Sequence, residues 1–160
     1  MKLKYTFTAI AISMTFSFAH AESYYIKYKG IKLGEIENLS TLKDLYLDAK
    51  ATNPFVRFLL GKDRYVFYAD KKPPIKNAKF RKDKNQLLFA LREAITHRPK
   101  QKIFTIRDNR KLIVECKDNI CQYKYYKYNK FKDSGIIEFD KNKKFFKLTE
   151  KKSDVVIIRK

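Results

Sequence analysis

The chain contains only two cysteines, Cys116 and Cys121, and their spacing predicts a disulfide across a β-hairpin. Between them lie Asp118 and Asn119, residue types that tolerate the positive φ of a two-residue turn. If these two form the loop, the cysteines face each other at a non-hydrogen-bonded position, where Cα atoms approach to about 4.5 Å. The closed loop is short, so the chain-entropy model assigns the bond only ~2 kcal/mol. We expect its main role to be fixing the register of the hairpin.

Two free thiols and half of a metal site are the alternatives for this cysteine pair. Zinc normally takes four ligands, with close pairs of Cys or His. After removal of the leader described below, the chain keeps a single histidine, His97. It precedes Arg98 and Pro99 at the end of a predicted helix, where an imidazole interacts favourably with the helix dipole. The sequence therefore predicts no metal site, no cofactor and no histidine general base.

Four acidic residues in the N-terminal half could meet across adjacent strands: Glu35, Glu37, Asp44 and Asp48. Two carboxyl groups cleave a glycoside when they are held at the right separation. Solvated strand faces explain these residues better, and the chain has neither a Gly-x-Ser-x-Gly elbow nor a phosphate-binding loop. We therefore predict no catalytic residues, and of an enzyme and a non-enzymatic protein we favour the second.

Residues 1–21 have the pattern of a cleaved signal peptide. A basic start precedes an uncharged, mostly apolar run over 5–18, and Ala19-His20-Ala21 is a small-x-small cleavage site. A membrane anchor is the competing interpretation, but the run is shorter than the ~20 apolar residues of a spanning helix. We expect a single β-rich domain, residues 22–160, in the periplasm of a bacterium, where disulfides persist.

The chain is strongly basic. Its formal net charge is +20, and the predicted leader contains two lysines and no acidic residue, which leaves +18 on residues 22–160. Such a charge favours lipid head groups, lipopolysaccharide or acidic glycans as partners, and peripheral contact with a membrane. Nucleic acid is not an expected partner of an exported protein. The alternative is a lysine-rich surface set by genome composition, because the lysines are spread along the whole chain.

Short strands at nearly regular spacing predict a mainly β fold, either a curved antiparallel meander or an open, barrel-like sheet. Two short helices interrupt it. Asn85 or Asp83 can cap the second helix, which carries Leu87, Leu88, Leu91 and Ile95 on one face and is stopped by Pro99. The expected strands cover 24–28, 45–51, 65–68, 103–107, 111–117, 123–126, 135–139, 144–149 and 155–159, with one more from Ile31, a bulge near Gly34 and a short extended piece at Phe80. Turns are expected at 108–110, 132–135, 140–142 and 151–154.

The first helix is apolar on nearly every side. Asn53 is its predicted cap, Pro54 its first residue, and Gly61 can close it. Such a helix must be buried all round or cover something apolar. The sequence favours a buried plug at one end of the sheet over a lid on an apolar cavity or a patch that touches lipid. The candidate ligand or lid residues are Phe55, Arg57, Phe58 and Leu59.

Tyrosines and lysines alternate in the segment after the second cysteine. The candidate basic-aromatic surface there consists of Tyr123, Lys124, Tyr125 and Lys127. Such a ribbon could stack bases or sugars. A strand with its tyrosines packed inward and its lysines outward fits the same pattern, and we favour that interpretation.

Several stretches resemble one known family. Residues 24–34 read Tyr-Tyr-Ile-Lys-Tyr-Lys-Gly-Ile-Lys-Leu-Gly, residues 86–92 read Gln-Leu-Leu-Phe-Ala-Leu-Arg, and Asp108-Asn109-Arg110 forms an Asp-x-Arg turn. This pattern resembles a family of uncharacterised exported bacterial proteins, whose members start with an aromatic strand followed by Gly-Ile-x-x-Gly. The chain departs from it in its cysteine pair and its lysine content. The resemblance implies a curved antiparallel sheet with helices in the periplasm, and it implies no activity.

Together these features predict a non-enzymatic binding or envelope-maintenance protein that holds an amphiphilic or anionic envelope component. The alternatives are a hydrolase acting on envelope glycans and a structural partner of an outer-membrane complex. A deep apolar cavity would favour the first function, paired buried carboxyl groups the second, and an exposed apolar patch without a cavity the third.

Overall fold

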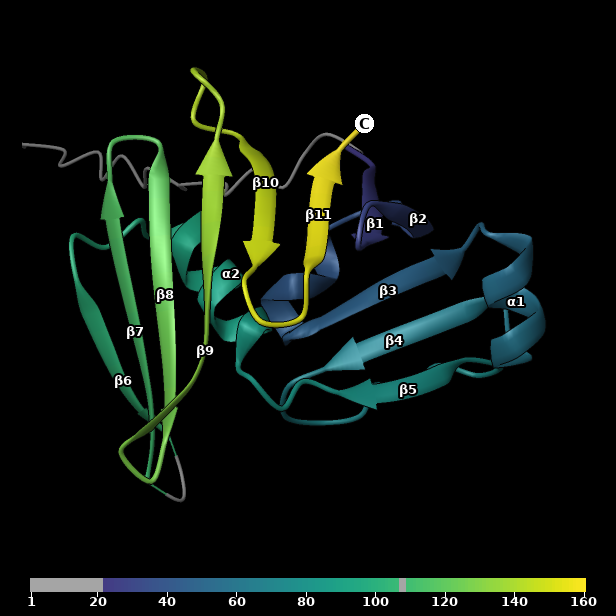
Figure 1. Ribbon diagram of the computed structural model, residues 1–160, viewed down its shortest axis with the longest axis horizontal. Coiled ribbons are helices and arrows are strands. Elements are labelled where there is room, and N and C mark those ends of the chain that lie inside the picture. Colours follow the sequence, from purple (N-terminus) through teal and green to yellow (C-terminus); the bar gives the residue numbers. More distant parts are fainter. Residues whose placement is uncertain (1–21, 107–108) are drawn as a thin grey trace, which may run out of the picture.

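The computed structural model describes residues 22–106 and 109–160, and the predicted signal peptide lies outside them. The described residues form one eleven-stranded sheet with the spatial order β5-β4-β3-β2-β1-β11-β10-β9-β8-β7-β6 (Figure 1). Strands β5 and β6 are its edges, so the sheet is not closed. The strands are β1 (Tyr24–Tyr28), β2 (Ile31–Ile36), β3 (Tyr46–Ala51), β4 (Arg64–Tyr68), β5 (Lys79–Lys82), β6 (Lys102–Ile106), β7 (Arg110–Lys117), β8 (Ile120–Lys127), β9 (Lys130–Phe139), β10 (Phe145–Glu150) and β11 (Val155–Arg159).

Pairing between β1 and β11 joins the two ends of the described chain in the middle of the sheet. All neighbouring strands are antiparallel except β4 and β5, which are parallel. The expectation of a purely antiparallel sheet is therefore wrong at this edge. Its cause is the segment 69–78, which carries the chain back along β4 before β5 begins. Figure 1 also shows that β3, β4 and β5 run at a large angle to β8 and β9.

The β7–β8 hairpin has the register that the cysteine spacing predicts. Cys116 pairs with Cys121, and Lys117 pairs with Ile120. Asp118 has a φ of 54°, as the tight turn requires. The two sulfur atoms lie 1.98 Å apart, at disulfide distance, and the Cα atoms lie 3.9 Å apart. The register prediction is thus confirmed.

The next turn lies earlier than expected, at Tyr128 and Asn129, which have φ values of 51° and 58°. The turn predicted at 132–135 is wrong, because β9 continues through these residues and pairs with β8 on one side and β10 on the other. Asp133 and Gly135 therefore occupy inward positions of a central strand, and both are buried.

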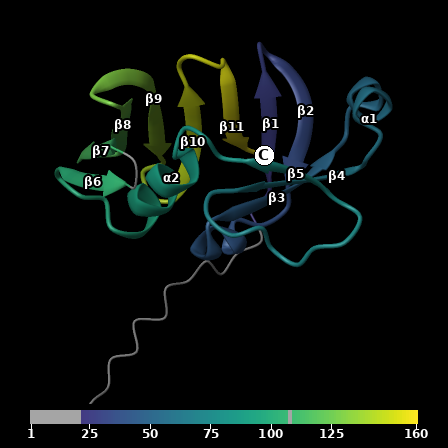
Figure 2. The same cartoon turned by 90° about the horizontal axis from the view of Figure 1, so that it is seen from below.

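In the part of the chain that the structure describes, three helices connect the strands: η1 (Ser40–Asp44), α1 (Pro54–Leu60) and α2 (Leu87–Thr96). Helix α2 lies against the sheet near β7 (Figure 2). Its residues Leu88 and Leu91 are buried, as their spacing predicts. Helix α1 lies between β3 and β4 at one end of the sheet (Figure 1). Within 22–106 and 109–160, no helix combines the length and the apolar character needed to cross a membrane.

Candidate functional site

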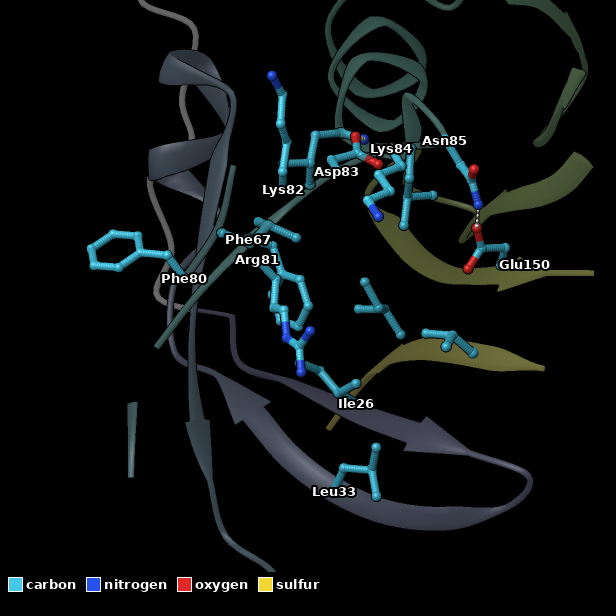
Figure 3. Close-up of a pocket in the computed structure, with 15 residues that line it drawn as sticks. Ile26, Leu33, Phe67, Phe80, Arg81, Lys82, Asp83, Lys84, Asn85 and Glu150 are labelled. Carbon is cyan, nitrogen blue, oxygen red and sulfur yellow. Dashed lines mark hydrogen bonds between the residues drawn. The ribbon is translucent and has the colours of Figure 1, made fainter. Parts of the chain in front are cut away.

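A cavity of about 640 Å³ lies between α2 and the strands on both sides of the β1–β11 junction. A volume of this size is typical of sites that take a small molecule. Most of its wall is aliphatic or aromatic, because inward-pointing residues of five strands and the first turn of α2 meet there. These residues are Ile26, Leu33, Leu47, Phe67, Val155, Ile157, Leu87 and Leu88 (Figure 3).

Basic residues border the cavity along β5 and the segment that follows it. Arg81, Lys82 and Lys84 all line it, and all three are exposed. In Figure 3 the Arg81 side chain lies beside Phe67 and reaches toward Ile26, whereas the Lys82 side chain points away. The site therefore combines an apolar interior with cations on its solvent side.

At one side of the cavity, Asn85 connects two buried carboxyl groups. Its Nδ2 donates to Oδ2 of Asp133 at 2.9 Å and to Oε1 of Glu150 at 3.5 Å (Figure 3 shows the second bond). Asp133 is 1% exposed and Glu150 is 7% exposed. Ser153 Oγ donates to the other oxygen of Glu150, and the Ser134 backbone N–H donates to Asp133. Glu150 and Asn85 also line the cavity.

A third carboxyl group, that of Asp83, lies shortly before α2 and belongs to this acidic cluster, because its charge acts on Tyr123 together with those of Asp133 and Glu150. Its Oδ2 accepts from the backbone N–H of Leu88 at 2.9 Å, which satisfies one free N–H in the first turn of α2. The N-cap position itself is occupied by Gln86, and not by Asp83 or Asn85 as predicted. Burial raises the pKa of Asp83 despite these backbone hydrogen bonds. Burial also raises the pKa of Glu150, and the neighbouring Asp133 carboxyl adds to that rise because it favours the protonated form of Glu150. Within the described residues none of the three carboxyls forms an ion pair.

The Tyr123 hydroxyl lies close to the same cluster. Tyr123 pairs with Gly135 on β9, and Gly135 pairs with Glu150 on β10, so the three residues form one row across the sheet. A Cβ on Gly135 would lie 2.3 Å from Cε1 of Tyr123, so the tyrosine ring covers the glycine. The hydroxyl is buried and finds no hydrogen-bond partner among the described residues. Burial, and then the charge of Glu150, raises its pKa.

Helix α1 is formed and capped as predicted, with Asn53 as N-cap and Gly61 at its end with a φ of 64°. The favoured interpretation of this helix as a buried plug is wrong. Phe55, Phe58 and Leu59 are 67%, 84% and 62% exposed. The helix is anchored through its caps and through Val56, which packs against the core, so its other apolar side chains need not be buried. None of the candidate lid residues lines the 640 Å³ cavity.

The candidate basic-aromatic surface is divided by the pleat of β8. Tyr123 and Tyr125 are 1% and 2% exposed, on the inward face. Lys124 is exposed and Lys127 is half-buried. The two tyrosine rings thus cannot stack on a ligand from outside, which leaves the inward packing that the sequence favoured.

The four acidic residues considered for catalysis lie elsewhere. Glu35, Glu37 and Asp48 line a groove of about 350 Å³, and Asp44 does not. Glu35 is ion-paired with Lys32 and Lys160, and Asp48 with Arg64. Hydrogen bonds from these lysines lower the pKa of Glu35, which keeps it ionised. Such carboxylates are held as charge partners and do not suit an acid catalyst.

His97 is the C-cap residue of α2, and its Nδ1 lies 3.2 Å from Glu93 Oε1. Lys102 Nζ lies 2.6 Å from the same oxygen, so His97 lies beside the Glu93–Lys102 ion pair at the helix end. Among residues 22–106 and 109–160, no cluster of three or more His, Cys, Asp or Glu could hold a metal ion.

Sequence reasoning missed the acidic cluster because its members come from three separate segments. One signal was present: Asp133 is in phase with the inward-facing residues Ile137 and Phe139 of β9. Comparisons of the chain with protein-family models, curated proteins and solved structures found no match. The resemblance to exported proteins therefore stays a prediction, and the functional argument rests on the geometry of the site.

Proposed function

We propose that this protein is a non-enzymatic periplasmic binding or envelope-maintenance protein, which holds one amphiphile with an acidic head group. The observation that carries the proposal is the 640 Å³ cavity, with its apolar walls and its basic border. Aliphatic side chains such as Leu33 and Ile157 would contact the hydrocarbon part of the ligand. Arg81 and Lys84 would attract the anionic head group, which could stay in contact with water.

Location and processing belong to the same proposal. Secretion through a leader cleaved after Ala21 would deliver the chain to a compartment rich in lipids and anionic polymers. The Cys116–Cys121 pair at disulfide distance supports an oxidising compartment. In this proposal the sheet curls around the ligand, and the large angle between its two halves supports that view.

A fluorescent fatty acid tests the proposal, because its emission rises on entering an apolar cavity. We expect saturable binding with one site per chain. The charge reversal Arg81→Glu should weaken it at least fivefold, because it replaces an attraction by a repulsion at the border of the cavity. Lys117→Glu makes the same change of charge at the tip of the β7–β8 hairpin and serves as control. Equal affinities of the two variants would contradict the proposed role of Arg81, and no binding to the wild type would contradict the function.

A hydrolase acting on envelope glycans is the second candidate, because Glu150 has a raised pKa and lines the cavity beside Asp133. A buried carboxyl of this kind is suited to donate a proton. Release of reducing ends from purified cell-wall glycan, abolished by Glu150→Gln, would favour this candidate over the binding protein.

A further inference from the structure

The outer face of α1 is apolar and has no covering in the described structure. Phe55, Phe58 and Leu59 are spaced i, i+3 and i+4, so they lie on one side of the helix. Their exposed fractions of 67%, 84% and 62% place this side toward solvent. Isolated apolar residues are common on protein surfaces, whereas three large ones on a two-turn helix form a continuous patch. We call these three residues the α1 face.

The helix that carries the α1 face is firmly attached. Asn53 accepts hydrogen bonds from Phe55 N at 3.0 Å and Val56 N at 3.3 Å, and its own Nδ2 donates to Lys32 O at 3.1 Å. Arg57 forms two hydrogen bonds with Asp63 at 2.8 and 2.9 Å. The rings are thus presented outward on a fixed support, which lowers the conformational entropy lost when they bind.

The charges around the α1 face restrict the choice of partner. Lys50 precedes the helix and Lys62 follows it, and both are exposed. Neither is within ion-pair distance of a carboxylate in the described residues, although Lys50 faces Glu35 across β2 and β3 and its charge acts on Asp63. The acidic Asp63 is already paired with Arg57. Exposed lysines beside an exposed aromatic cluster, on a chain with a net charge of +18 over residues 22–160, complement a surface that is both apolar and anionic.

We propose that the α1 face docks on an anionic phospholipid bilayer. Phe55, Phe58 and Leu59 enter the boundary between head groups and acyl chains, and Lys50 and Lys62 contact the head groups. The position of α1 at the end of the sheet leaves it free to reach a flat bilayer (Figure 1). This docking does not depend on the cavity ligand, because none of the three residues lines the cavity.

The chain contains no tryptophan, so one introduced tryptophan reports its own surroundings. Phe58→Trp keeps the site aromatic and should not disturb the fold. Protein recovered from the periplasmic fraction is mixed with vesicles of phosphatidylglycerol and phosphatidylcholine. We expect a blue shift of the emission and quenching by lipids brominated on their acyl chains. Ile103→Trp is the matched control, because Ile103 is 53% exposed on β6, at the opposite edge of the sheet; it should show neither effect.

A second pair of variants measures affinity by vesicle co-sedimentation. The double change Phe55→Ser, Phe58→Ser should weaken binding at least about tenfold, because it removes two rings from the membrane boundary. Ile103→Ser should change it less than twofold. Binding should weaken as salt rises, and should be much weaker to pure phosphatidylcholine vesicles.

Equal quenching of the two tryptophan variants, or full binding by the double serine variant, would overturn the proposal. Absence of binding of the wild-type protein to anionic vesicles would also overturn the proposal. That result would include the case in which the α1 face is covered by a second copy of the chain. The fluorescent fatty acid is measured with the same variants, so loss of docking is distinguished from loss of the cavity function.

Discussion

Gly135→Ala tests the row of residues beneath the acidic cluster. An alanine Cβ would lie 2.3 Å from Cε1 of Tyr123, 2.7 Å from Cζ of Tyr123 and 2.7 Å from the backbone oxygen of Thr149. The tyrosine ring is 1% exposed and packed on all sides, and the carbonyl belongs to a paired strand, so neither contact relaxes easily. Overpacking of this kind lowers the free energy of unfolding by about 1–3 kcal/mol. Because the Cβ would clash with both the Tyr123 ring and the Thr149 carbonyl, we expect a loss at the upper end of this range.

For a domain of this length a loss of about 3 kcal/mol corresponds to a fall in Tm of roughly 10 °C. Thermal unfolding followed by far-UV circular dichroism measures it. Tyr123→Phe is the matched variant, because it keeps the ring over Gly135 and removes only a hydroxyl that has no described partner. It should leave the Tm unchanged or raise it by a few degrees, since a buried unsatisfied donor is lost. A Gly135→Ala protein that melts within 1 °C of the wild type would refute the placement of the ring.

Three further predictions concern the disulfide, α1 and pH. Without reductant, Cys116 and Cys121 should resist alkylation in protein recovered from the periplasm; two freely reacting thiols would contradict the pairing. Phe58→Ala should lower the free energy of unfolding by less than about 0.5 kcal/mol, because the ring is 84% exposed. Leu148→Ala in the core should lower it by about 2–5 kcal/mol. Equal losses of the two variants in urea unfolding would contradict the exposure of α1. Burial raises the pKa of Glu150 above its ordinary 4.5, so the folded state binds its proton more tightly than the unfolded chain does. The free energy of unfolding should therefore rise as the pH falls from 7 toward about 4.5, and the rise should be smaller in Glu150→Gln; a wild-type profile no steeper than that of the variant would contradict this assignment.

Local signals in the sequence predicted local structure well. Asp118 at positive φ and the pairing of Cys116 with Cys121 follow from turn chemistry and spacing alone. The caps of α1, Asn53 and Gly61, follow from the same kind of reasoning. Such features depend on a few neighbouring residues, so no knowledge of the rest of the fold is needed.

Features that depend on distant segments were not predictable from pattern. The segment of β5 has one apolar residue, Phe80, which gives no indication of parallel pairing with β4. The apolar composition of α1 predicts burial, but composition cannot distinguish a core helix from one that faces outward. The acidic cluster depends on the pairing of β9 with β10 and on the start of α2, which bring Asp83, Asp133 and Glu150 together.

The central claim is that the cavity holds an amphiphile, and native mass spectrometry of protein recovered from the periplasmic fraction tests it most directly. We predict an added mass of one lipid-like molecule per chain, released by organic solvent. Leu33→Trp should abolish the added mass, because Leu33 lines the cavity and the larger tryptophan ring would occupy part of its volume. Phe131→Trp is the control and should retain the added mass, because Phe131 is exposed on β9 and does not line the cavity. Wild-type protein that carries no added mass and acquires none from an envelope lipid extract would contradict the claim.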